Sequence, residues 1–302
     1  MEHRIFSPGK LLLTSEYVVL DGALSLAIPT KWGQEFFFEE ISDEQSIVYW
    51  TAFHQNELWL TIKIDYQKWE ILETNRKESA EFILKILKNI QELSAITFQE
   101  KKSYRLKTNL QFPSDYGLGS SSTLMNNLAE WAAIDAFVLN ENNLGGSGYD
   151  IAVAQKKSPI LYRHEGISRE IELVAFDPEF KKDLIFIHLN QKQNSREGIQ
   201  LYKSKEKSPA LIAEFSDLTQ KVVAAPTLAE FSELMEVHEA QLSGFLGLET
   251  VKEKHFADCP VFVKSLGAWG GDFVLSSKFS GFEGYFREKG FSAIFSYEDL
   301  IR

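Results

Sequence analysis

The chain has 302 residues, of which 44% are hydrophobic and 13% aromatic, so it is a folded globular protein with one large domain or two moderate ones. Its net charge of −11 argues against nucleic acid as a partner, because a polyanion would be repelled. One cysteine, Cys259, excludes an intramolecular disulfide, and the lack of a membrane-length apolar run or a signal-peptide core predicts a cytoplasmic protein without a membrane partner.

The first part of the chain is predicted to be rich in β-structure. Residues 4–6 are a short strand candidate, residues 7–10 (SPGK) a loop, and the apolar run that follows is a second strand closed by the turn Asp21-Gly22. Apolar residues at alternate positions predict a hairpin over residues 46–64 that turns near residues 54–57. Lys10 lies beside an apolar run, although most lysines of this kind are simply solvated.

A glycine-bearing turn follows the next helix and strand. Apolar residues on one face predict an amphipathic helix over Lys77–Leu93, and alternation over residues 104–112 predicts a strand. Gly117 and Gly119 then allow unusual backbone angles and close approach to a ligand, just before a predicted helix. The unpaired N–H groups of its first turn would attract an anion such as phosphate, whereas the alternative is a serine-rich N-cap without a ligand.

Two further glycine segments accompany this turn. In residues 145–150 (GGSGYD), Asp150 is either an N-cap or a carboxylate at the edge of an anion site. In residues 261–277, two β-like runs flank LGAWGGD, which is either a plain hairpin or part of the same site. The chain contains neither a Walker A loop nor a dinucleotide-binding fingerprint.

The second half is predicted to alternate strands and helices. Strands are expected over residues 160–162, 170–174 and 184–189, with a domain boundary near Asp177-Pro178, followed by a polar loop over residues 190–199. Helices are expected over residues 210–223 and after Thr227, with His238 in the core. Six scattered histidines give no support to a zinc site.

Three of these segments resemble, in order and spacing, the signature motifs of the GHMP kinases, which phosphorylate small molecules such as galactose, homoserine, mevalonate and phosphomevalonate. The segments are SPGKLLLTSEYVVLDGALSLAIPT, PSDYGLGSSST and KSLGAWGGD, and G-L-G-S-S is the most specific part. Residues 145–152 (GGSGYDIA) resemble the catalytic-aspartate segment of phosphomevalonate kinases. The resemblance covers most of the chain.

The resemblance implies an α+β, two-domain GHMP kinase fold. Residues 1–180 would form the N-terminal nucleotide-binding α/β domain with a left-handed βαβ unit, and residues 181–302 a ferredoxin-like C-terminal domain. ATP and Mg²⁺ are the implied cofactors, a small-molecule acceptor is the implied partner, and the protein is expected to be a monomer or a homodimer.

Site residues are also implied by the resemblance. Lys10 and Asp150 match the catalytic pair. The ATP phosphates would be bound by the glycine turn and the start of the following helix, with the Ser121 hydroxyl near Mg²⁺: Gly117, Leu118, Gly119, Ser120, Ser121 and Ser122. The third motif would support the phosphate loop and the substrate: Gly267, Ala268, Gly270 and Gly271. Candidates for binding an anionic acceptor lie in the polar loop: Lys192, Ser195 and Arg196, with Lys264 as a further cation.

The sequence departs from the family pattern in three places. Ser15-Glu16-Tyr17 stands where many members have Gly-Glu-His, Trp269 stands where a small residue is usual, and no glutamate aligns as a second Mg²⁺ contact. These changes concern the walls of the site and the metal, whereas Lys10 and Asp150 are retained.

Phosphoryl transfer requires positioning and positive charge or N–H groups around the transferred group, which a helix N-terminus and Mg²⁺ supply. Asp150 would accept the acceptor's proton, and Lys10 would lower the acceptor's pKa. The prediction is an ATP-dependent kinase for a mevalonate-pathway acceptor, with phosphomevalonate favoured by GGSGYD and mevalonate as the alternative. A catalytically silent regulator and a serine hydrolase remain as other classes; the hydrolase lacks a G-x-S-x-G elbow.

Overall fold

The computed structural model describes residues 3–98, 101–166, 168–191, 195–267 and 269–302, and for Ser195 and Arg196 it describes the backbone. The chain divides into two compact units that alternate along the sequence. Unit 1 comprises Met1–Gly9, Trp32–Ser114 and Gly119–Lys157, and unit 2 comprises Lys10–Lys31, Asp115–Leu118 and Ser158–Arg302. The expected domain boundary at residue 180 falls within unit 2 and stays a prediction.

Unit 1 contains a mixed sheet. Strand β3 (Ile47–His54) pairs antiparallel with β4 (Glu57–Asp65), which pairs antiparallel with β5 (Glu70–Thr74). On its other side β3 pairs in parallel with β6 (Ser103–Leu110), and β6 pairs antiparallel with the second half of β2 (Ser25–Ile41). Because β3 and β6 are parallel, their connection must cross over, and it does so through β4, β5 and α1 (Lys77–Leu93). The left-handed unit stays a prediction.

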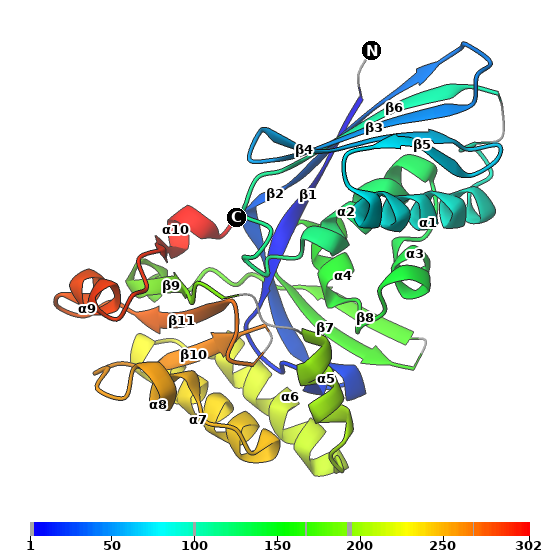
Figure 1. Ribbon diagram of the computed structural model, residues 1–302. Helices are drawn as coiled ribbons and strands as arrows, with labels where there is room; N and C mark the ends of the chain where they lie inside the picture. The colour runs from blue at the N-terminus through cyan, green and yellow to red at the C-terminus, as the bar shows by residue number, and fades with distance from the viewer. Residues whose placement is uncertain (1–2, 99–100, 167, 192–194, 268) are drawn as a thin grey trace. The chain divides into compact units, whose positions relative to one another are not determined.

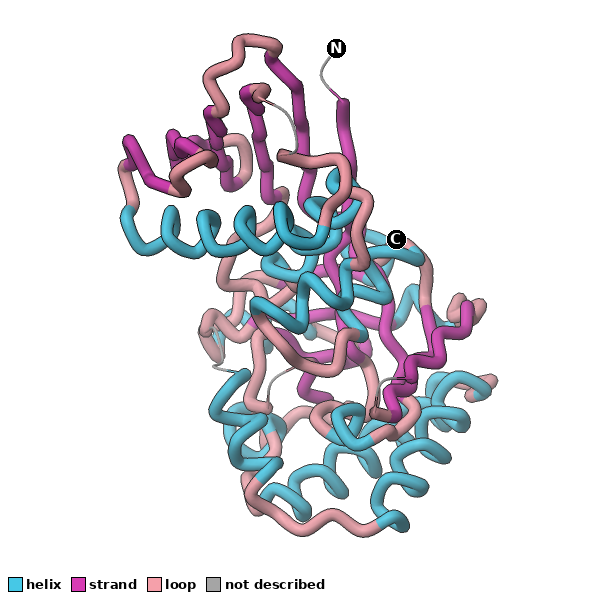
Figure 2. Tube along the Cα trace, turned by 90° about the vertical axis from the view of Figure 1, so that its right-hand side faces the viewer, coloured by secondary structure: helices cyan, strands magenta, loops and turns pink. Residues whose placement is uncertain are grey.

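Helices cover one face of this sheet. The long helix α1 runs beside the strands in both views, and α2 (Ser120–Ala132), α3 (Ala136–Asn143) and α4 (Tyr149–Lys156) follow it in the chain (Figure 1, Figure 2). The buried face of α1 carries Ile83, Ile86 and Ile90 at helical spacing, and these residues belong to one core with Trp50 and Met125. Helix α2 packs against both α3 and α4.

Unit 2 contains the first half of β2, which pairs antiparallel with β7 (Ile160–Glu165), and β7 pairs with β8 (Ser168–Leu173). A second, antiparallel sheet has the strand order β10-β11-β9-β12. Its strands are β9 (Leu184–His188), β10 (Val263–Leu266), β11 (Phe273–Ser277) and β12 (Ile294–Ser296).

The helices of unit 2 complete a ferredoxin-like pattern. Between β9 and β10 lie α5 (Ser195–Lys203), α6 (Pro209–Ala224), α7 (Leu228–Leu246) and α8 (Val251–His255), and between β11 and β12 lies α9 (Phe282–Glu288) (Figure 1). The remaining short helices are η1 (Val18–Asp21), η2 (Glu179–Asp183) and α10 (Tyr297–Leu300). The order β-α-β-β-α-β, with the first strand next to the fourth and third, is the ferredoxin-like arrangement. The predicted α+β fold class is therefore confirmed, and the structure contains two sheets.

Most periodic segments were predicted correctly. The helix over Lys77–Leu93 and the hairpin over residues 46–64 are confirmed, and the hairpin turns at Gln55-Asn56, whose φ angles are 51° and 69°. The expected loop at residues 7–10 is wrong, because β1 (His3–Leu12) runs through it. Ser7, Pro8 and Gly9 are buried, so backbone pairing with β2 satisfies polar groups that water does not reach.

The strand expected over residues 11–20 is also wrong in its second half. After Leu12 the chain forms a turn and then η1, which ends at Gly22 with φ of 90°. Within the described residues no helix has the length and apolar character needed to cross a membrane.

Candidate active site

Residues of all three motifs meet within unit 2. The Lys10 Nζ donates a hydrogen bond of 2.9 Å to the carbonyl oxygen of Gly117, and the Lys10 backbone N–H donates one of 3.0 Å to the carbonyl oxygen of Leu118. Gly117 has φ of 66°, and a Cβ built on it would lie 1.8 Å from the Asp272 Oδ2. Glycine is therefore required at this position both by the backbone angle and by the carboxylate of the third motif.

The second half of the turn lies in unit 1 at the start of α2. Gly119, with φ of 87°, is the N-cap residue, so the expected serine cap is wrong. The Ser122 and Thr123 hydroxyls donate to the carbonyl oxygens of Gly119 and Ser120, at 3.0 and 2.9 Å. Among the described residues no side chain caps this helix, and its first turn carries no carboxylate. The first N–H groups and the positive end of the helix dipole are thus available to an anion.

Asp150 lies in the first turn of α4, in unit 1. The N-cap of α4 is Gly148, with φ of 86°, so the alternative interpretation of Asp150 as an N-cap is wrong. Its half-buried carboxylate accepts a hydrogen bond of 3.2 Å from the Ile151 N–H. Lys10 belongs to unit 2, and its pairing with Asp150 stays a prediction.

The third motif connects β10 to β11. Gly267 and Gly270 have φ angles of 78° and 74°, which favour glycine, and Ala268 lies outside the described residues. The Asp272 carbonyl oxygen accepts from the Leu189 N–H at 2.9 Å, which ties the motif to the end of β9. The Trp269 N–H donates to the Tyr17 Oη at 2.6 Å. Two departures from the family pattern, Tyr17 and Trp269, are therefore in direct contact.

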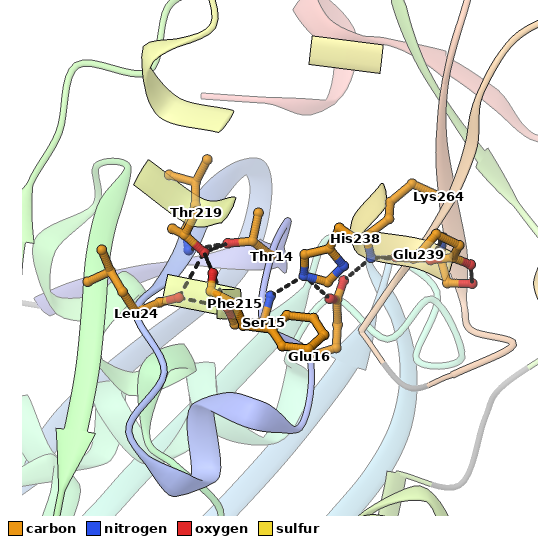
Figure 3. A network of polar contacts seen from close by, with 11 residues as sticks. Thr14, Ser15, Glu16, Leu24, Phe215, Thr219, His238, Glu239 and Lys264 are labelled. Atoms are coloured by element: carbon orange, nitrogen blue, oxygen red, sulfur yellow. Dashed lines mark hydrogen bonds and ion pairs between the residues drawn. The ribbon is translucent and has the colours of Figure 1, made fainter. Parts of the chain in front are cut away.

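A buried polar network surrounds Ser15 and Glu16, which precede Tyr17 in the first departure (Figure 3). The Lys264 Nζ, on β10, lies 2.7 Å from the Glu16 Oε1, 3.5 Å from the Glu239 Oε2 and 2.6 Å from the Ser265 carbonyl oxygen. The Ser15 N–H donates to the His238 Nε2 at 2.7 Å. Lys264 and His238 have no exposed surface, so Lys264 as a cation for an incoming phosphate is wrong.

Burial and charge set the protonation of this network. Burial raises the pKa of Glu16 above its ordinary value, although the nearby Lys264 acts in the opposite direction. Burial, and then the charge of Lys264, hold the pKa of His238 well below its ordinary value. A neutral His238 with a bare Nε2 is also what the hydrogen bond from the Ser15 N–H requires. Sequence reasoning placed His238 in the core correctly but missed its partners.

The polar segment after β9 differs from the predicted loop. Lys192 lies outside the described residues, whereas Ser195 and Arg196 begin α5, and only their backbone is described. A Cβ built on Gly198 of α5 would lie 2.1 Å from the Tyr17 Oη, so α5 packs closely on the residue that contacts Trp269. The loop prediction is therefore wrong from Ser195 onward, and the proposed role of these residues in acceptor binding stays a prediction.

The structure also bears on a metal site formed by protein side chains alone. No three His, Cys, Asp or Glu side chains are gathered to hold a metal ion within the part of the chain that the structure describes. Mg²⁺ in kinases is of a different kind, since substrate phosphates and water supply most of its ligands and the protein supplies one or two. The prediction that Ser121 contacts Mg²⁺ is untested by this observation.

Several solved structures are similar to this chain in fold. No protein-family model and no curated protein matches the sequence. The fold is similar to that of Streptococcus pneumoniae phosphomevalonate kinase in complex with phosphomevalonate and AMPPNP, with a TM-score of 0.70, 16% identity and coverage of 96% of this chain and 97% of that one. Methanococcus jannaschii mevalonate kinase is similar with a TM-score of 0.68, 15% identity and coverage of 98% of this chain and 97% of that one. Lactococcus lactis galactokinase complexed with galactose has a TM-score of 0.65, 14% identity and coverage of 95% of this chain and 88% of that one.

The chain has the GHMP-kinase fold. Coverage near the full length of each structure means that both sheets and the elements between them take part in the match. The GHMP-kinase fold therefore extends over the positions of all three sequence motifs, from Lys10 to Asp272.

Proposed function

We propose that the protein is an ATP-dependent small-molecule kinase, which transfers the γ-phosphoryl group of ATP to a mevalonate-pathway acceptor in the cytoplasm. The observation that carries this proposal is the set of contacts at Gly117: the Lys10 ammonium on its carbonyl oxygen and the Asp272 carboxylate against its Cα. Three segments that are far apart in the sequence thus share one glycine, at the turn before a helix whose N-terminus lacks a side-chain cap among the described residues.

The residues of the glycine turn and of the start of α2 fit a nucleoside triphosphate. The N–H groups of the first turn of α2, which no side chain among the described residues caps, are donors of the kind that bind phosphate oxygens. Gly119, with φ of 87°, has no Cβ that would keep a phosphate away, and Gly117 leaves room for the Asp272 carboxylate. Bound Mg²⁺ would neutralise charge on the phosphates, with the Ser121 hydroxyl as the proposed protein ligand. The loop residues proposed for the phosphates are Gly117, Leu118, Gly119, Ser120, Ser121 and Ser122.

Proposed roles for Lys10 and Asp150 follow from their chemistry. The Asp150 carboxylate accepts the proton of the acceptor's attacking oxygen, and the Lys10 ammonium stabilises the negative charge that develops as this proton leaves. The Lys10 Nζ is already oriented by the Gly117 carbonyl oxygen at 2.9 Å, so little reorganisation would precede the reaction. The third motif holds the loop in place through Asp272.

The proposal is tested by ADP release from purified protein and MgATP with mevalonate, phosphomevalonate, galactose and homoserine as acceptors. Turnover with any of these supports the kinase and excludes both the silent regulator and the serine hydrolase. Absence of turnover together with tight binding of an acceptor would favour the regulator. Hydrolysis of an ester substrate without ADP would favour the hydrolase.

Phosphomevalonate is the acceptor that we propose, with mevalonate as the alternative. Support comes from the GGSGYD segment and from the similarity to a phosphomevalonate kinase fold, and the same similarity extends to mevalonate kinases. A phosphorylated acceptor needs a cation, and Arg196 in the first turn of α5 is the proposed one. Arg196→Ala should therefore raise the KM for phosphomevalonate far more than the KM for ATP. Turnover of mevalonate alone, or an unchanged KM in the variant, would contradict this choice.

A further inference from the structure

The first half of the phosphate loop carries an aromatic contact that the proposed function does not use. Tyr116 precedes Gly117, and its ring stacks on the imidazole of His188 with centroids 4.2 Å apart and planes 29° apart. Phe273 meets the Tyr116 ring edge-on at 5.5 Å, and Phe295 does so at 6.2 Å. Tyr116 is therefore embedded in an aromatic group contributed by the second sheet.

His188 is the last residue of β9, and hydrogen bonds fix both its backbone and its imidazole. Its backbone N–H donates to the Ala293 carbonyl oxygen at 2.9 Å, and its Nδ1 accepts from the Asn190 N–H at 3.3 Å. The side chain is 3% exposed, and its Nε2 has no hydrogen-bond partner among the described residues. Because Nδ1 is an acceptor, a neutral His188 carries its proton on Nε2.

The charge state of His188 suits a stacking partner. Burial lowers its pKa, and this effect outweighs the neighbouring Asp115 and Asp272 groups, which raise it. The imidazole is thus neutral near pH 7 and presents a flat, desolvated ring to Tyr116. Its burial argues against a direct chemical role.

Side-chain and backbone contacts, not secondary structure, hold these loop residues within unit 2. Asp115–Leu118 form no helix or strand, although they belong to unit 2 while the residues on both sides belong to unit 1. Lys10 contacts the carbonyl oxygens of Gly117 and Leu118, and Asp272 lies against the Gly117 Cα. Leu118 is fully buried, and Tyr116 is half-buried against rings of the second sheet. Tyr116 is therefore one of two side chains that anchor this segment, and it is the one next to Gly117, whose carbonyl oxygen accepts from Lys10.

We propose that Tyr116 and His188 form an aromatic clamp that positions the phosphate loop and Lys10 for nucleotide binding, with both side chains acting as positioning residues. This inference rests on the proposed kinase function. The clamp acts through Gly117, the next residue in the chain, and its loss would let the loop leave the geometry in which Lys10 contacts it. Nucleotide binding depends on this geometry, whereas acceptor binding depends on it much less.

The test removes the stack from either side and measures MgATP affinity by calorimetry, together with KM for ATP and for the acceptor. Tyr116→Leu and His188→Leu should each weaken MgATP binding about 3- to 10-fold, as expected for loss of one aromatic pair, and the double variant should be little worse than either. The KM for the acceptor should change less than about twofold. Tyr116→Phe keeps the ring and should bind MgATP like the wild type.

Tyr285→Leu is the matched control, since Tyr285 packs edge-on against Phe279 in unit 2 but belongs to α9. It should lower the unfolding midpoint without changing MgATP affinity. His188→Leu provides a second route to the same contact if Tyr116→Leu does not fold. Equal MgATP affinity in wild type and both leucine variants would overturn the clamp alone. A wild-type protein that neither binds MgATP nor releases ADP would overturn the proposed function and the clamp with it.

Discussion

Replacing Lys264 with methionine should destabilise the protein strongly. The Lys264 Nζ lies 2.7 Å from the Glu16 Oε1 and 3.5 Å from the Glu239 Oε2, and none of these three side chains has more than 4% of its surface exposed. Methionine has a similar length without the charge, so Lys264→Met leaves two carboxylates buried with no cation and only a small change in packing. Removing one partner of a buried ion pair costs about 3–5 kcal/mol.

The loss should depend on pH in a defined direction. Burial already raises the pKa of Glu16 above 4.5, and Lys264 opposes this rise, so removal of Lys264 should raise the pKa further. A carboxyl whose pKa is higher in the folded state than in the unfolded state binds its proton more tightly when folded. The stability of Lys264→Met should therefore be closest to that of the wild type below pH 4.5 and should fall increasingly below it as pH rises.

Urea unfolding followed by circular dichroism over a series of pH values measures both effects. Of the six tryptophans, Trp269 alone belongs to unit 2, so its fluorine resonance in fluorotryptophan-labelled protein follows the unfolding of this unit. The matched control is Lys252→Met, because Lys252 pairs with Glu236 at 2.9 Å on the surface and its loss should cost less than about 1 kcal/mol. A deficit for Lys264→Met that equals this control, or that does not grow with pH, would refute the reasoning.

Three further predictions address the candidate site and its surroundings. Asp150→Asn should lower kcat about 100-fold or more in a coupled ADP assay while MgATP affinity stays within a few fold, because the carboxylate is proposed to act on the acceptor. Near-normal turnover would remove Asp150 from the catalytic pair. Gly119→Val should weaken MgATP binding at least about 10-fold by calorimetry, because φ of 87° and close approach to phosphate both resist a β-branched residue; unchanged affinity in a folded variant would place the phosphates elsewhere. The free energy of unfolding of the wild type should fall as pH drops below 6.5, because His238 is neutral when folded and protonates on unfolding. In urea titrations His238→Gln should make this pH dependence weaker. An identical pH profile in the variant would contradict the prediction.

Local sequence patterns predicted much of the fold. The apolar face of Lys77–Leu93 has a period that only a helix satisfies, and the helix begins and ends at the predicted residues. Gly117 and Gly119 of the central turn and Gly267 and Gly270 of the third motif have positive φ angles, as residues with this freedom at a tight turn should. These signals are local, so neighbouring residues alone determine them.

Tertiary contacts decide the parts that the sequence did not reveal. Glu16 and Lys264 are separated by 248 positions, and no local pattern distinguishes a lysine that will be buried from one that will be solvated. Asp272 was visible in the third motif, but its contact with Gly117 depends on β11 pairing with β9. Likewise, the first part of α5 fell within the predicted polar loop over residues 190–199 because its composition is polar. Its packing on Tyr17, which requires a glycine at position 198, is a tertiary contact that the local composition does not indicate.

The departures from the family pattern are best understood together. Ser15 and Tyr17 have positive φ angles of 62° and 63°, which cost non-glycine residues about 1–3 kcal/mol each and persist only where the surroundings enforce them. The surroundings do so here: the Ser15 N–H is held by His238, the intervening Glu16 by Lys264, and the Tyr17 hydroxyl by the Trp269 N–H. The turn at Ser15, where the family that the sequence resembles often has glycine, is thus surrounded by buried polar contacts, and the Trp269 N–H donates to the hydroxyl of Tyr17 beside it.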